Sequence, residues 1–249
     1  MPPAHISHAT AQGRRSQQQD RFVVSKLAKG QLLAVIDGHG GSTTAELLAK
    51  ELSAALESAL NTQKGRVDLA LKETVACLAG KTAQETSGST LSIVFIPGDQ
   101  TFAHAAVLGD SPVIILDAQG GLHISPLHNA RSNPQERTAA LARGARFSEG
   151  YLEDPQVPGE GLQMSRALGD RSLARILNRE PDIYRVPLGK NSFVLLSTDG
   201  VLDSFDPMVE AQLNRIATLV KNGQEAQDLV EDALRRQTGD NVTVLIWKA

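Results

Sequence analysis

The chain has 249 residues, of which 41% are apolar, and its 25 Lys and Arg against 28 Asp and Glu give a net charge of −3. This balance leaves no basic excess to neutralise phosphates, which argues against a nucleic-acid-binding protein. Cys77 is the only cysteine, which excludes an internal disulfide framework and a cysteine-based zinc cluster. No apolar run approaches the ~20 residues that span a bilayer, and Met1–Arg15 carries no secretory signal. We therefore expect a cytoplasmic protein that makes no membrane contact, with a monomer as the default state.

Hydrophobic periodicity predicts seven strands and five helices. In chain order the strands are Arg21–Ser25, Gln31–Ile36, Ser89–Ile96, Thr101–Val107, Val113–Leu116, Ser192–Ser197 and Val242–Trp247. The helices are Thr43–Leu60 and Val67–Leu78 after the second strand, Pro134–Arg143 after the fifth, and Met208–Val220 and Glu225–Arg236 before the last. Because regular strand–helix alternation is absent, we predict an α+β fold in which two antiparallel β-sheets form a β-sandwich. Pairs of α-helices are expected to flank both outer faces, and no linker divides the single domain 1–249.

Several aspartates stand where a predicted strand meets a turn. Asp37 and Asp199 each follow an apolar strand and precede a glycine, and Asp240 directly precedes the last strand. An isolated Asp-Gly is most often only a tight turn. If these strand ends converge at one edge of the sandwich, however, the three carboxylates repel one another unless cations neutralise them. Hard oxygen donors without His or Cys partners favour Mg²⁺ or Mn²⁺ over zinc or copper.

A series of short motifs, each weak alone, runs in a fixed order along nearly the whole chain. The motifs are Arg15 with Asp20, Val35–Gly41, Ser87–Thr90, Gly109–Ser111, Ser165–Asp170, Glu180–Asp182, Ser197–Gly200 with Asp203, and Gly239–Asn241. In this combination the chain resembles the metal-dependent Ser/Thr protein phosphatases of type 2C, the PPM family, in their bacterial form. The resemblance implies hydrolysis of phosphate monoesters on phosphoserine and phosphothreonine proteins by a water or hydroxide activated between two metal ions.

The resemblance also implies a set of metal ligands. Asp37 matches the carboxylate that bridges the two ions, and the carbonyl of Gly38 completes one coordination shell. The ions expected are Mn²⁺ or Mg²⁺, two per site with a weaker third. Asp199 and Asp240 match ligands of the first ion, and Asp20 matches a position on the side of the second ion. Asp110 and Asp203 match positions linked to the third ion.

Two further residues match catalytic positions of the family. Arg15 matches the arginine that forks onto the phosphate oxygens, a task that its planar donors suit, although a shift of register would give this role to Arg14. His39 matches the general acid that protonates the departing Ser or Thr oxygen. The alternative for His39 is a structural histidine that packs the turn.

The chain departs from the family pattern at a few positions. Gln19 stands where many members have Glu, and Pro112 stands where Arg is usual. Leu127-His128 replaces the usual Asp-His pair. Residues 128–161 correspond to the flap, which varies in the family and tunes the choice of substrate.

Three functions share these features. The first is a phosphatase that acts on phosphoproteins, opposes a Ser/Thr kinase and serves signal transduction. The second is a catalytically inactive phosphatase-like scaffold or phospho-sensor, against which Asp37, Asp199 and Asp240 argue because all three are retained. The third is a phosphatase for a small phosphorylated metabolite or for phosphotyrosine.

Overall fold

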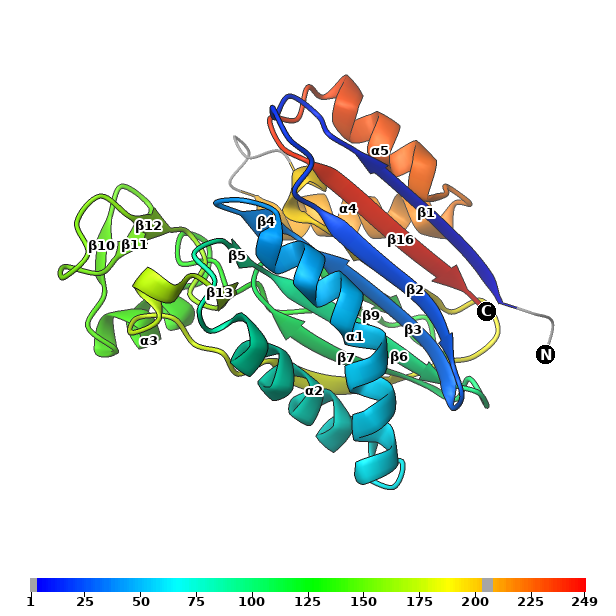
Figure 1. The fold of residues 1–249 in the computed structure, drawn as a ribbon. Coiled ribbons are helices and arrows are strands. Elements are labelled where there is room, and N and C mark those ends of the chain that lie inside the picture. The colour runs from blue at the N-terminus through cyan, green and yellow to red at the C-terminus, as the bar shows by residue number, and fades with distance from the viewer. Residues whose placement is uncertain (1–3, 203–207) are drawn as a thin grey trace.

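The computed structural model describes residues 4–202 and 208–249, and two five-stranded antiparallel sheets form its centre (Figure 1). The first sheet contains β2 (Arg21–Leu27), β3 (Gly30–Ile36), β6 (Leu91–Pro97), β7 (Phe102–Leu108) and β14 (Asp182–Pro187), in the order β14-β7-β6-β3-β2. The second sheet contains β1 (His5–Ala11), β8 (Val113–Leu116), β9 (Leu122–Ile124), β15 (Phe193–Ser197) and β16 (Val242–Lys248), in the order β1-β16-β15-β8-β9. The predicted sandwich of two antiparallel sheets is confirmed.

The central strands are apolar at almost every position because both of their faces are covered. In β3, Leu33 and Val35 point into the core between the sheets, whereas Leu32 and Ala34 point to the outer core. Successive side chains of a strand alternate between faces, so a strand buried on both sides reads as a continuous apolar run. This explains why the sequence signalled these strands so clearly.

Two helix pairs cover the outer faces of the sheets, as predicted (Figure 1). Helices α1 (Thr43–Thr62) and α2 (Val67–Thr82) share one apolar cluster with the first sheet. Helices α4 (Val209–Lys221) and α5 (Ala226–Arg235) share another with the second sheet. Among the described residues, no helix is long and apolar enough to cross a membrane.

A smaller lobe, residues 129–178, projects from one end of the sandwich (Figure 1). It contains α3 (Pro134–Ala142), β10 (Arg146–Ser148), β11 (Tyr151–Glu153), β12 (Gly161–Leu162), β13 (Leu168–Gly169) and the short 3-10 helix η1 (Arg171–Leu173). A small apolar cluster, which includes Ala140, Leu152 and Ile176, holds it together. Strand β13 joins β5 (Gly88–Ser89) and β4 (Gly38–His39) in a short sheet next to the strand ends.

Three edge strands of the main sheets, β1, β9 and β14, were not predicted from the sequence. None of the three residues of β9 is buried. Only Ala9 is buried in β1, and only Val186 in β14, so none of these strands shows the apolar signal of the central strands. Each pairs with one neighbour only.

The predicted strand Ser89–Ile96 is divided at Thr90, whose backbone and hydroxyl bind the backbone of Asp37. The Thr90 amide donates to the Asp37 carbonyl (2.9 Å), and the Thr90 hydroxyl accepts from the Asp37 amide (3.1 Å).

Trp247 provides a test of the core between the sheets. It is 1% exposed and packs among side chains from both sheets. Trp247→Ala should lower the free energy of unfolding by about 3–5 kcal/mol, because the cavity adds to the lost burial. Urea titration measures this, with Leu234→Ala as the control, since Leu234 on α5 is 42% exposed. Equal, small effects of both substitutions would contradict the packing described here.

Candidate metal centre

The first sheet brings three of the predicted aspartates to one end. Arg21 at the start of β2 pairs with Ile36 at the end of β3, so Asp20 and Asp37 emerge side by side. Strand β7 ends nearby, and Gly109 leads from it to Asp110. Antiparallel pairing of short, apolar strands therefore sets the positions of these carboxylates.

The second sheet brings two more aspartates to the same end. Strand β15 ends at Ser197, which pairs with Val244 of β16, so Asp199 after β15 lies beside Asp240 before β16. Asp199 opens the short 3-10 helix η2 (Asp199–Val201). A Cβ at Gly200 would lie 1.9 Å from the carbonyl oxygen of Asn241, so only glycine permits this close approach.

Asp20 connects the two sheets through hydrogen bonds. Its Oδ2 accepts from the hydroxyls of Thr198 (2.9 Å) and Thr243 (2.8 Å), which both belong to the second sheet's side of the site. The side chain is buried, and this burial raises the pKa of Asp20 to about 6 against the lowering effect of the two threonines. The Asp20 carboxylate thus spans the junction between the two sheets.

Asp37 and Asp199 are the most strongly perturbed carboxyls of the cluster. Burial is the largest cause that raises the pKa of each well above its usual value. The negative charges around them act in the same direction: Asp37 feels Asp199, Asp20, Asp110 and Asp240, and Asp199 feels Asp110, Asp240 and Asp20. Such a cluster is costly when ionised and becomes stable when a cation compensates it.

The chemistry of these donors fits a hard divalent cation. Asp110 is 3% exposed; its Oδ2 accepts from Asn129 (2.8 Å), while its buried Oδ1 has no hydrogen-bond partner within the described ranges. All the gathered donors are oxygens, as Mg²⁺ and Mn²⁺ prefer. Within residues 4–202 and 208–249, no three His, Cys, Asp or Glu side chains already stand in a chelating arrangement. The carboxylates therefore gather without closing on one point.

Gly38 lies in β4 directly beneath the loop before β2. A Cβ at this position would lie 2.6 Å from the carbonyl oxygen of Gln19, so a side chain would push the loop and Asp20 away. The remaining predicted ligand, Asp203, lies outside the described residues.

Arg15 is held against the cluster by a pinned loop. Its Nη2 lies 2.7 Å from Asp240 Oδ2, and its Nε donates to the Gly239 carbonyl (3.3 Å). The Asn241 side chain donates to the Gln12 and Gln17 carbonyls and accepts from the Gln19 amide, at 2.8, 2.9 and 2.8 Å. Of the two candidate arginines, Arg15 is therefore the one whose guanidinium the structure places on a carboxylate of the site.

His39 occupies β4 and contacts a carboxylate that the sequence had not assigned a role. Its Nε2 lies 2.9 Å from both carboxylate oxygens of Asp170, which follows β13. Its Nδ1 is buried and has no hydrogen-bond partner in the described part of the chain. Asp170 belongs to the Ser165–Asp170 motif, which was the only sign of its importance in the sequence.

A second His–Asp pair, in which His128 is buried and Asp182 is partly exposed, connects the Asp110 loop to β14. The Gly109 amide donates to His128 Nδ1 (3.0 Å), which leaves Nε2–H to donate to Asp182 Oδ2 (3.1 Å). This hydrogen bond, with help from Arg166, lowers the pKa of Asp182 to about 2. Arg166 also donates to Glu136 within the lobe (Nη2 to Oε1, 2.5 Å). Its charge-assisted bond to Asp182 ties the lobe to β14.

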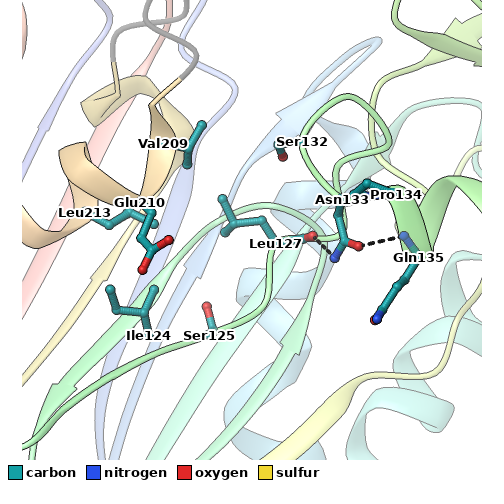
Figure 2. A pocket seen from close by; sticks show the side chains of 10 residues that line it. All are labelled: Ile124, Ser125, Leu127, Ser132, Asn133, Pro134, Gln135, Val209, Glu210 and Leu213. Atoms are coloured by element: carbon teal, nitrogen blue, oxygen red, sulfur yellow. Dashed lines mark hydrogen bonds between the residues drawn. The ribbon is translucent and has the colours of Figure 1, made fainter.

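A pocket of about 670 Å³ lies beside this region, between the start of α4 and the segment that leads into α3 (Figure 2). Asn133 shapes one wall, because its side chain donates to the Leu127 carbonyl (3.0 Å) and accepts from the Gln135 amide (3.1 Å). Of the described residues that line the pocket, Glu210 alone is charged. Nothing in this lining compensates a phosphate, whereas Arg15 stands at the carboxylate cluster.

Comparison with known proteins identifies the family of this chain. The family model described as Protein phosphatase 2C matches residues 4–242, and the chain belongs to this family. It is 27% identical over 257 residues to a protein kinase and PP2C-like domain-containing protein of Arabidopsis thaliana, covering 96% of this chain and 38% of that protein. It is 26% identical over 249 residues to a probable protein phosphatase 2C 45 of Oryza sativa subsp. japonica, covering 96% and 85%.

Solved structures share the fold over almost the whole chain. A Caenorhabditis elegans sex-determining protein superposes with a TM-score of 0.77 at 25% identity, covering 100% of this chain and 65% of that one. The catalytic domain of the serine/threonine protein phosphatase PstP, solved in complex with two manganese ions, superposes with a TM-score of 0.59 at 22% identity, covering 98% and 97%. The α+β fold with two main antiparallel sheets is thus shared with known phosphatases.

The buried Asp20 makes the stability of the metal-free protein depend on pH. Its folded-state pKa of about 6 lies above the usual 3.8, so the folded state binds the proton more tightly than the unfolded state. The free energy of unfolding should therefore fall as the pH rises from about 4 to 6. Asp20→Asn should remove this penalty and stabilise the protein by roughly 1–3 kcal/mol at pH 7.5 in chelator, with little effect at pH 4.

Urea unfolding in chelator at both pH values measures this change. Glu231→Gln is the matched control, since the contacts of Glu231 with Gln227 and Arg235 on α5 are both exposed. Loss of stability in Asp20→Asn at pH 7.5 would show that the carboxylate is not penalised.

Proposed function

We propose that this protein is a metal-dependent phosphatase that removes phosphate from phosphoserine and phosphothreonine in proteins. The observation that carries this proposal is the convergence of five aspartates from both sheets beside the guanidinium of Arg15. Membership of the protein phosphatase 2C family supports it. The two manganese ions in the PstP structure support Mn²⁺ or Mg²⁺ as the cofactor, with two ions per site.

The residues that would hold these ions are those that the strand ends bring together. Asp37 would be the ligand shared by both ions, and the Gly38 carbonyl would complete the coordination shell of one of them. Asp199 and Asp240 would bind the first ion, and Asp20 would serve the side of the second. Asp110 and Asp203 remain candidates for a weaker third ion, and the unpartnered Oδ1 of Asp110 is consistent with this. When bound, such ions supply Lewis acidity that activates water and stabilises charge on the phosphoryl group.

The chain's own side chains would bind the phosphate and supply a proton. Arg15 would exchange its ion pair with Asp240 for a forked contact to two phosphate oxygens, which can reach it because its side chain is 54% exposed. His39 would donate a proton to the departing Ser or Thr oxygen. The oxygen needs this proton because an alkoxide is a poor leaving group.

The physiological substrates would be phosphoproteins, in opposition to a Ser/Thr kinase and within signal transduction. The lobe at residues 129–178 includes most of the predicted flap, 128–161, and borders the carboxylate cluster through Asn129, which donates to Asp110. Its position is suited to contact with the polypeptide around a phosphorylated residue.

Mn²⁺-dependent release of phosphate from a phosphothreonine peptide tests the proposal. The wild-type protein should release phosphate with Mn²⁺ and not in chelator. Asp37→Ala should lower turnover by about 10³-fold or more, since the loss of a shared ligand removes several kcal/mol of transition-state stabilisation. A wild-type protein that binds the phosphopeptide without hydrolysing it would instead identify a scaffold or phospho-sensor. Preference for a phosphotyrosine peptide or a small phosphorylated metabolite would replace the proposed substrate class.

Arg15 and Arg14 form a matched pair for testing phosphate binding. Arg15→Ala should lower kcat/KM for the phosphopeptide by about 10–100-fold, because charge-assisted hydrogen bonds contribute about 1.5–3 kcal/mol. Arg14→Ala should change it little, since Arg14 is exposed. The opposite pattern in steady-state kinetics would give the phosphate role to Arg14.

His39 is tested by comparing substrates that differ in their leaving group. His39→Ala should slow a phosphothreonine peptide by about 10²–10⁴-fold, the usual contribution of a general acid. It should slow 4-nitrophenyl phosphate far less, because nitrophenolate leaves without a proton. Equal slowing of both substrates at saturating Mn²⁺ would mean that His39 has only a structural role.

A further inference from the structure

Asp170 forms a close contact with His39, the side chain proposed above to donate a proton. Both of its carboxylate oxygens lie 2.9 Å from His39 Nε2, and Asp170 is only 6% exposed. The His39 side chain is 22% exposed, so the ring reaches solvent while its Nε2 faces the protein. A carboxylate accepts hydrogen bonds and does not donate them, so Nε2 must carry the hydrogen in this contact.

The backbone around Asp170 is fixed in an unusual conformation. Gly169 and Asp170 both have positive φ, +78° and +47°, and the Asp170 amide donates to the Ser87 carbonyl (3.1 Å). Arg179 clamps the preceding residues by donating to the carbonyls of Ala167 and Gly169. A non-glycine residue in the left-handed region is strained and persists where the surroundings fix it.

Gly88 provides the space for this contact. A Cβ at position 88 would lie 2.0 Å from Asp170 Oδ2 and 2.2 Å from His39 Nε2. Gly88 pairs with His39 on one side and with Gly169 on the other. The short sheet β13-β5-β4 therefore brings the two side chains together over a glycine.

The consequence concerns the other ring nitrogen. With Nε2–H committed to Asp170, Nδ1 is the ring nitrogen left to act on a substrate; it is buried and has no hydrogen-bond partner within the described ranges. Asp110, a member of the carboxylate cluster, feels the charge of His39, so the ring lies close to the site. The same division of roles between two ring nitrogens operates in hydrolase triads, where a carboxylate fixes the tautomer of the catalytic histidine.

We propose that Asp170 is a positioning residue that fixes the ring of His39, so that Nδ1–H is presented to the departing Ser or Thr oxygen. This inference rests on the proposed function. A water oxygen forms the new bond to phosphorus, and the bond from phosphorus to the substrate oxygen breaks. The electron pair of that bond stays on the substrate oxygen, which takes the proton from Nδ1. The attacking water loses one proton to solvent, and His39 regains one from solvent, so that water and phosphomonoester yield alcohol and inorganic phosphate.

A double-mutant cycle with two substrates tests whether Asp170 acts through His39. With Mn²⁺, Asp170→Asn should lower kcat for a phosphothreonine peptide by roughly 10–10³-fold, with a smaller change in KM and a smaller change for 4-nitrophenyl phosphate. Adding Asp170→Asn to His39→Ala should produce no further loss, because the residue through which it acts is gone. Asp170→Glu, which keeps the carboxylate, should recover part of the turnover that Asp170→Asn loses.

Asp182→Asn is the matched control, since it removes the carboxylate that pairs with the other buried histidine, His128. It should affect both substrates equally, through stability, as thermal unfolding would show. Equal slowing of both substrates by Asp170→Asn, or an undiminished further loss in the His39→Ala background, would overturn the proposal.

The tautomer of His39 gives a readout that does not depend on activity. Nitrogen NMR of the folded, metal-free protein, at a pH where the ring is neutral, should show the hydrogen on Nε2. Asp170→Asn should shift this signal toward the Nδ1–H form, and a wild-type ring with its hydrogen on Nδ1 would contradict the proposal. A wild-type protein that hydrolyses neither substrate would refute the proposed function, whereas the NMR result would still decide the geometry of the pair.

Discussion

The repulsion among carboxylates at one end of the sandwich is the constraint on which the rest of this structure depends. Burial and mutual charge raise the pKa of Asp37 and Asp199 well above the usual value. The fold accepts this cost because both faces of its central strands are buried, which gives the strand ends little freedom to separate. The packing of the core thus stabilises an arrangement of carboxylates that repel one another and that can bind a divalent cation.

The surrounding hydrogen bonds point each group in a definite direction. Asp20 joins the two sheets through the hydroxyls of Thr198 and Thr243, and Asn241 fixes the loop that carries Arg15. Thr90, which lies between β5 and β6, forms hydrogen bonds with the backbone of Asp37. These polar contacts come from segments far apart in the chain, so the site forms only when both sheets have assembled. Folding and the formation of the site are therefore one event.

The sequence predicted the parts of this protein whose signals are local. Central strands such as Val113–Leu116 were visible because apolar residues mark them, and so was helix α2, predicted over Val67–Leu78 and observed over Val67–Thr82. Asp37 and Asp199 were visible because each ends such a strand. The role of Asp170 was not, because its contact with His39 exists only through the pairing of β13, β5 and β4. Strand β1 was missed for the related reason that an edge strand needs few apolar residues.

The central claim is that the carboxylate cluster is a site for divalent cations, and locating bound metal tests it most directly. Crystals soaked in Mn²⁺ and measured at the manganese absorption edge would show each ion by its anomalous signal. The account predicts two strong peaks, with the Asp37 carboxylate in contact with both and Asp199 and Asp240 in contact with one. No anomalous signal at this cluster, or peaks only at carboxylates elsewhere on the surface, would contradict it.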